Sequence, residues 1–95
     1  MSISFIIKFK TKSDKQADFH DIMSNVKSEL PKVKGCIGVV IHQNSQDESS
    51  YVVVEKWESK KLHEMHVERL VSSGVWDNIV GHLSEGPAGD YFKLI

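Results

Sequence analysis

Hydrophobic and polar residues alternate at the start of the chain and then change to a helical spacing. Apolar side chains occupy every second position of Ile3–Phe9, the pattern of a strand with one buried face. Apolar residues then recur every three or four positions up to Leu30, which predicts an amphipathic helix. Ser13 and Gln16 have the spacing of a capping box, so we expect this helix to begin at Asp14.

The middle of the chain predicts two strands and a second helix. Cys36–Gln43 and Tyr51–Trp57 are rich in β-branched and aromatic residues, and the polar segment 44–50 separates them as a hairpin loop would. Ser59 follows directly and is a suitable N-cap, because its hydroxyl can accept from a free amide of the first helical turn. The helix itself is expected over Lys60–Leu70.

The remaining segments complete a known order of elements. Ser72–Gly74 interrupts the helix, a short amphipathic helix is expected over Val75–Leu83, and a last strand over Asp90–Ile95. The order strand, helix, strand, strand, helix, strand predicts an α+β, ferredoxin-like βαββαβ fold with a four-stranded antiparallel sheet. We expect residues 1–95 to form a single domain.

The expected sheet lacks a clearly polar face. Both faces of Cys36–Gln43 and of Tyr51–Trp57 carry apolar side chains, whereas helices are expected to cover only one face. We therefore expect a homodimer in which two sheets pack face to face through a sizeable hydrophobic interface.

Composition narrows the class of protein. A net charge of −1 provides no basic patch for nucleic acid, and no apolar run approaches the roughly 20 residues that span a bilayer. The first residues lack the charged leader of a signal peptide. The single cysteine, Cys36, cannot form an internal disulfide. We expect a cytoplasmic domain that binds neither membrane nor nucleic acid.

One polar residue occupies an unexpected position on the second helix. At about 100° per residue and with Leu62 at zero, Leu70 lies near 80° and Met65 near 300°. His66, near 40°, falls in the middle of this apolar stripe, and His63, near 100°, falls at its edge. A buried imidazole needs a hydrogen-bond partner or a cavity, because unpaired burial costs about 1–3 kcal/mol. His66 is therefore the first candidate for a functional residue.

Two segments resemble a known family. Lys34–Gly38, at the start of the second strand, and Val54–Ser59, followed by His66, resemble the antibiotic biosynthesis monooxygenase (ABM) family of small dimeric α+β barrel proteins. The resemblance implies oxidation of quinols, anthrones or other electron-rich aromatic compounds by O2, without flavin, haem or metal. Trp57 matches the tryptophan at the strand end of the family, and His66 matches its helical histidine.

The resemblance implies a cofactor-free site with a dry, aromatic-walled cavity. A neutral histidine, with an ordinary pKa near 6.5, suits the abstraction of a substrate proton. We expect His66 to be this base or an orienting partner, and Trp57 to be a wall. The residues expected to line the cavity are Phe5, Ile7, Met65, Trp76 and Ile79.

Several alternatives stay open at this point. Relatives that degrade haem use a similar histidine, and a dimeric module could bind a small aromatic without turnover. An isomerase or lyase without a cofactor is a further possibility. His63 and His66 could share a metal ion, although a third ligand is not evident. Tyr51 and Glu55 have the strand parity of Trp57, which leaves open whether either faces the cavity.

Overall fold

A computed structural model describes residues 2–95 as one antiparallel sheet with helices on one side. The strands are β1 (Ile3–Lys10), β2 (Cys36–Gln43), β3 (Ser50–Trp57) and β4 (Ala88–Phe92). The helices are α1 (Gln16–Glu29), α2 (Lys60–Ser72) and α3 (Val75–Val80), with short 3-10 turns η1 (Ser13–Lys15) and η2 (Leu30–Lys32). The strand order β2-β3-β1-β4 confirms the predicted ferredoxin-like α+β fold, and the sheet is not closed.

The two central strands decide which face of the sheet is buried. β1 and β3 pair so that Ile7 lies opposite Val53 and Phe9 opposite Tyr51. These residues are buried, whereas Lys8, between them on β1, is exposed. Alternate side chains therefore point toward the helices, as the period of two predicts.

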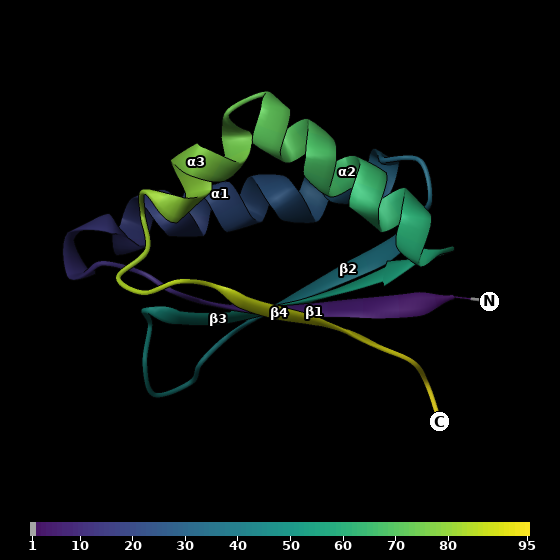
Figure 1. Ribbon diagram of the computed structural model, residues 1–95. Helices are drawn as coiled ribbons and strands as arrows, with labels where there is room; N and C mark the ends of the chain where they lie inside the picture. The colour runs from purple at the N-terminus through teal and green to yellow at the C-terminus, as the bar shows by residue number, and fades with distance from the viewer. Residues whose placement is uncertain (1) are drawn as a thin grey trace.

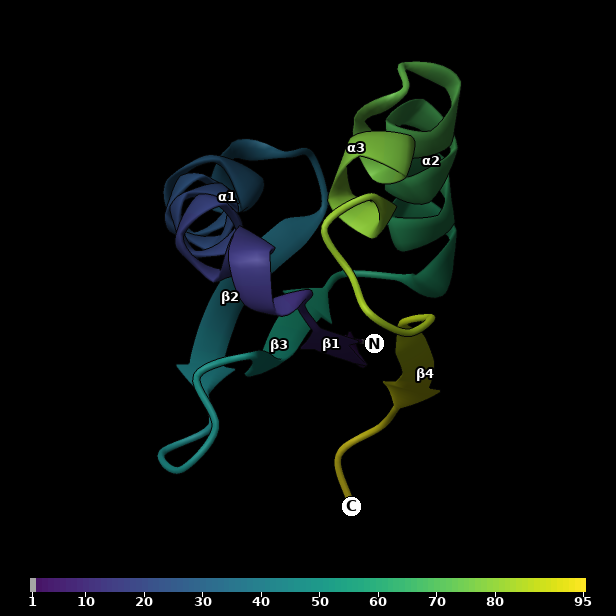
Figure 2. The ribbon, with the colours of Figure 1, turned by 90° about the vertical axis from the view of Figure 1, so that its left-hand side faces the viewer.

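The helices cover this face in two groups. Figure 1 shows α1, α2 and α3 all on the same side of the sheet. The turned view in Figure 2 shows α1 above β2 and the α2–α3 pair toward β4. Buried residues of α1, such as Phe19 and Met23, meet the inner side chains of the sheet and Ile79 of α3 in one apolar core.

The predicted element boundaries are mostly confirmed, with two corrections. Ser59 caps α2, because its Oγ atom accepts from the amide of Leu62 at 3.2 Å. The capping box at Ser13 is wrong: the chain first makes the 3-10 turn η1, with Lys15 N–H donating to the Lys12 carbonyl, and α1 begins without a side-chain cap. The last strand is Ala88–Phe92 and not the predicted Asp90–Ile95, because Ala88 to Phe92 are the residues that pair with Lys8 to Ser4 of β1. Among residues 2–95 no helix is long and apolar enough to cross a membrane.

Candidate functional site

Two neighbouring cavities lie on the helix-covered side of the sheet. The larger, of about 460 Å³, lies between α1 and the α2–α3 pair, and the smaller, of about 230 Å³, lies between α2 and the β1–β4 edge. Both are mainly apolar. The residues that line both are Phe9, Glu55, His66, Leu70 and Trp76. His66 and Glu55 are therefore the titratable groups on the boundary shared by the cavities.

The orientation of α2 differs from the one predicted by its apolar residues. His63 is 2% exposed and His66 is half-buried, whereas Met65 is 43% exposed. Leu62 packs against the backbone of Gly35 at the edge of the helix, so the buried stripe is rotated toward the two histidines. Met65, predicted to line the cavity, lies on the solvent side of α2 and lines neither cavity.

Strand β3 delivers Glu55 and Trp57 to the inner face, because they are two positions apart. Trp57 is fully buried, and its Nε1–H donates to Glu55 Oε1 at 2.9 Å. The indole does not line either cavity directly. Its ring centre lies 5.2 Å from that of His66, so the indole packs against an imidazole that does line the cavities. Trp57, predicted to be a wall of the cavity, instead contacts a residue of that wall.

A second polar contact links α2 to β4. The Nδ1 atom of His63 lies 2.6 Å from the hydroxyl oxygen of Tyr91, and Nε2 lies 3.6 Å from Glu55 Oε1. The ring of Phe5 lies over the imidazole, with ring centres 4.2 Å apart. Within residues 2–95, these contacts form a continuous polar chain Tyr91–His63–Glu55–Trp57 inside an otherwise apolar interior.

Burial sets the charge of these groups. It lowers the pKa of His63 to about 4, with a smaller contribution from His66. It also lowers the pKa of His66, with the Arg69 guanidinium acting in the same direction. Burial raises the pKa of Glu55, although the Trp57 N–H opposes the rise. Near pH 7 both imidazoles are therefore neutral, and the contact of His63 with Glu55 is not an ion pair despite its short distance.

The structure brings together most of the residues predicted to form the site. Phe5 and Ile7 line the smaller cavity, Ile79 lines the larger one, and Trp76 lines both. Three polar residues were not among the predicted site residues: Glu55, His63 and Tyr91. Strand parity with Trp57 was the available signal for Glu55, but no local pattern could bring Tyr91 next to α2. Among residues 2–95, no group of three or more His, Cys, Asp or Glu side chains is placed to hold a metal ion.

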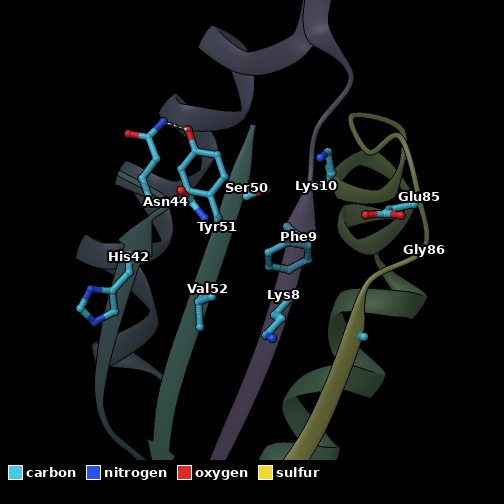
Figure 3. Close-up of a pocket in the computed structure, with 12 residues that line it drawn as sticks. Lys8, Phe9, Lys10, His42, Asn44, Ser50, Tyr51, Val52, Glu85 and Gly86 are labelled. Atoms are coloured by element: carbon cyan, nitrogen blue, oxygen red, sulfur yellow. Dashed lines mark hydrogen bonds between the residues drawn. The ribbon is translucent and has the colours of Figure 1, made fainter. Parts of the chain in front are cut away.

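The opposite side of the sheet carries a different hollow. Its volume is about 530 Å³, and Figure 3 shows its residues, with Lys8, Val52 and His42 side by side on three strands. Lys10 and Glu85 lie at its rim. The charged and polar side chains make it unlike the apolar cavities on the helical side.

Fold and site together define a class of small α+β proteins in which an apolar pocket with a histidine in its wall lies between the helices and an antiparallel sheet. The model of the family described as antibiotic biosynthesis monooxygenase matches residues 2–70. The chain belongs to this family, which confirms the resemblance seen in its sequence. A search among curated proteins found no match.

Solved structures show the same fold at low sequence identity. Rv0793 from Mycobacterium tuberculosis matches with a TM-score of 0.86 and 12% identity, covering 100% of this chain and 96% of that one. A conserved protein from Methanosarcina mazei Go1 matches with a TM-score of 0.85 and 16% identity, covering 98% and 92%. SnoaB from Streptomyces nogalater, a cofactor-independent oxygenase, matches with a TM-score of 0.82 and 11% identity, covering 98% and 92%.

Proposed function

We propose that this protein is a cofactor-independent monooxygenase that oxidises a small electron-rich aromatic compound with O2. The observation that carries the proposal is the half-buried His66 imidazole at the wall shared by two apolar cavities. Membership of the ABM family and the fold shared with the oxygenase SnoaB support the same reaction class.

The site suits the first step of such a reaction, which is proton removal. His66 is neutral near pH 7, because burial lowers its pKa, and a neutral imidazole can accept a proton from a phenol or an activated methylene. Trp76 and Phe9 provide aromatic surface on the cavity wall for a flat substrate. The apolar lining excludes water, so radicals formed inside the cavity recombine before they escape.

The reaction balances without a further reductant. An anthrone-type methylene loses a proton to His66, and the resulting carbanion gives one electron to O2. The organic radical and superoxide combine into a carbon–peroxide bond, and the peroxide takes a proton back. Loss of water then leaves a carbonyl, so one oxygen atom enters the product and the other leaves as water.

Oxygen uptake tests the proposal directly. We expect wild-type protein to consume O2 with at least one member of an anthrone and hydroquinone panel, and His66→Phe to lose about 100-fold or more of that rate. Met65→Phe is the matched control, because it places the same ring on the solvent side of α2. Equal turnover by wild type and His66→Phe would remove His66 from the mechanism, and no uptake with any compound would contradict the oxygenase proposal.

We further propose that two copies pair through the open face of the sheet. Val40, Val54 and Ile6 lie side by side across β2, β3 and β1 on this face, and Val40 is 54% exposed. Phe92 extends the apolar surface along β4 and is 49% exposed. A second copy would bury this apolar row, which water otherwise surrounds.

Sedimentation equilibrium tests the dimer. We expect wild-type protein to sediment as a dimer of 10.8 kDa chains, and Val40→Lys to shift it toward monomer. The control Val71→Lys places the same charge on an exposed valine of α2 and should leave the dimer intact. A wild-type monomer at micromolar concentration would contradict the pairing.

A further inference from the structure

Glu55 has a place in the site that the proposed reaction does not use. It is 9% exposed, and its side chain lines both cavities beside His66. Oε1 accepts from Trp57 Nε1 and faces His63 Nε2, whereas Oε2 has no hydrogen-bond partner in the part of the chain that the structure describes. The Glu55 side chain keeps 11% of its surface exposed and lines both cavities, so the carboxylate is not fully enclosed.

We propose that Glu55 binds a hydroxyl group of an aromatic ligand through Oε2, and that His63 and Tyr91 are positioning residues that hold this carboxylate in place. The inference deepens the proposed function and rests on it for the identity of the ligand as a substrate. It narrows the substrate class to neutral hydroxylated aromatics, such as phenols, naphthols and hydroxylated anthrones.

The hydrogen-bond network favours one arrangement of protons. A neutral His63 carries a single N–H. Its Nδ1 atom faces the Tyr91 hydroxyl, and its Nε2 atom faces the Glu55 carboxylate. We assign this proton to Nε2, because Nε2–H can then point to Glu55 Oε1 while Nδ1 accepts from the Tyr91 hydroxyl. The opposite tautomer would place an imidazole lone pair against a carboxylate oxygen. The carboxylate therefore favours the Nε2–H tautomer, and the Tyr91 hydroxyl, which can donate to Nδ1, holds the ring in that position.

The surrounding charges favour a neutral hydroxylated ligand over an anionic one. Asp21 and Glu29 of α1 line the larger cavity together with Glu55, whereas Lys and Arg side chains do not line it among residues 2–95. The groups that face Glu55 from other elements are the neutral His63, His66 and Tyr91, and the Cys36 thiol on β2. A carboxylate ligand would meet repulsion here, and a phenol would meet an acceptor.

Anaerobic calorimetry with a matched pair of ligands isolates the hydroxyl contact. The probes are 2-naphthol and 2-methoxynaphthalene, which share a ring system and differ in one O–H donor. At a pH where Glu55 is ionised, we expect wild-type protein to bind 2-naphthol about tenfold more tightly, since a hydrogen bond to a charged acceptor contributes that much. Glu55→Gln should reduce the preference to about twofold. Glu68→Gln, which removes an exposed acid of α2 that lines neither cavity, should leave it unchanged.

The pH dependence of this preference tests the positioning residues. In wild-type protein the preference should fall as acidic pH protonates Glu55. Tyr91→Phe removes the hydroxyl that holds Nδ1, so the imidazole can turn away from Glu55. The ionised carboxylate then loses its N–H contact, and the midpoint should move to higher pH. A purely structural role of Tyr91 would weaken both ligands equally and leave the midpoint in place, which would overturn its positioning role.

The outcomes separate this inference from the proposed function. A hydroxyl preference that Glu55→Gln abolishes, in a protein that consumes no O2 with any compound, supports the binding role and contradicts the oxygenase. Oxygen uptake that depends on His66, together with an equal preference in wild type and Glu55→Gln, supports the oxygenase and contradicts the binding role of Glu55. Absence of any preference for 2-naphthol in wild type, including absence of binding, overturns the inference.

Discussion

The Nδ1 atom of His63 lies 2.6 Å from the hydroxyl oxygen of Tyr91, and this contact connects α2 with β4 across 28 residues of sequence. β4 is an edge strand that pairs with β1 alone. The contact therefore fastens the helix that carries both site histidines to the outer edge of the sheet. Tyr91 also packs its ring against Phe5, with ring centres 5.2 Å apart.

Removal of the Tyr91 hydroxyl should destabilise the fold measurably. Tyr91→Phe keeps the ring but leaves the buried Nδ1 atom of His63 without its partner, which should cost about 1–2 kcal/mol. Urea denaturation at pH 7 measures the loss. The control Ser28→Ala removes an exposed hydroxyl bond to the Asn25 carbonyl and should change stability by less than about 0.5 kcal/mol. Equal effects of the two substitutions would contradict the importance of the buried contact.

The buried imidazole should also make the fold sensitive to acid. The pKa of His63 is lowered to about 4 from an ordinary 6.5, so the folded state holds the neutral ring and the unfolded state takes up the proton more readily. The stability that this provides is complete above pH 6.5 and is lost as pH falls toward 4. By linkage the loss amounts to about 3 kcal/mol over that window.

Comparison with a variant isolates this contribution from two others. The pKa of His66 is also lowered, so this residue too makes the fold less stable as pH falls. The pKa of Glu55 is raised, so this residue has the opposite effect and makes the fold less stable as pH rises. We expect the difference in unfolding free energy between wild type and His63→Leu to fall with decreasing pH between 6.5 and 4. A difference that does not vary over this range would show that His63 titrates normally in the fold.

The sequence predicted the sheet and the helices well because both depend on local periodicity. Strand alternation places Phe5, Ile7 and Trp57 on the same face, as the structure confirms. The orientation of α2 depends on its tertiary contacts, which no local pattern contains. An apolar stripe through Leu62 and Met65 fits the helix alone, but the neighbours of α2 include polar groups on β3 and β4.

Those polar neighbours explain why a histidine, and not the apolar Met65, turns inward. His63 finds a hydroxyl on Tyr91 and faces a carboxylate on Glu55, so its burial leaves no polar atom unsatisfied. Tyr91 lies on a strand 28 residues away along the chain, and only the antiparallel pairing of Phe5 with Tyr91 brings it near α2. Such tertiary partners are invisible to a helical projection.

The cap of α2 provides a prediction that rests on local structure alone. Ser59 Oγ accepts the Leu62 amide at 3.2 Å in the first turn of the helix. Ser59→Ala leaves that amide without a side-chain partner and should destabilise the protein by about 1 kcal/mol. Ser59→Asp, which also caps, should keep most of the stability. Thermal unfolding compares the two, and an equal loss in both variants would contradict the capping role.

Substitution of Gly35 and Gly74 by alanine can distinguish the cost of backbone strain from the cost of steric overlap. Both glycines have a positive φ, of 92° and 85°, so the backbone strain would be similar at the two positions. A Cβ atom at Gly35 would lie 2.7 Å from Cβ and Cδ1 of Leu62, whereas a Cβ atom at Gly74 would meet nothing within 4 Å. Gly74→Ala should therefore cost about 1 kcal/mol, from the left-handed backbone alone.

Gly35→Ala adds the overlap with Leu62 to that backbone cost and should destabilise by about 2–4 kcal/mol in total. Leu62 lies in the first turn of α2, so the overlap would also push the start of the helix away from the sheet. Leu62→Ala in the Gly35→Ala background removes the overlapping Cδ1 and Cγ atoms but keeps Cβ, so it relieves part of the overlap and should cost somewhat less than the sum of the single changes. Urea denaturation of wild type, the two single variants and the double variant completes a double-mutant cycle. Free energies that simply add would show that Leu62 of α2 does not contact Gly35, the residue before β2.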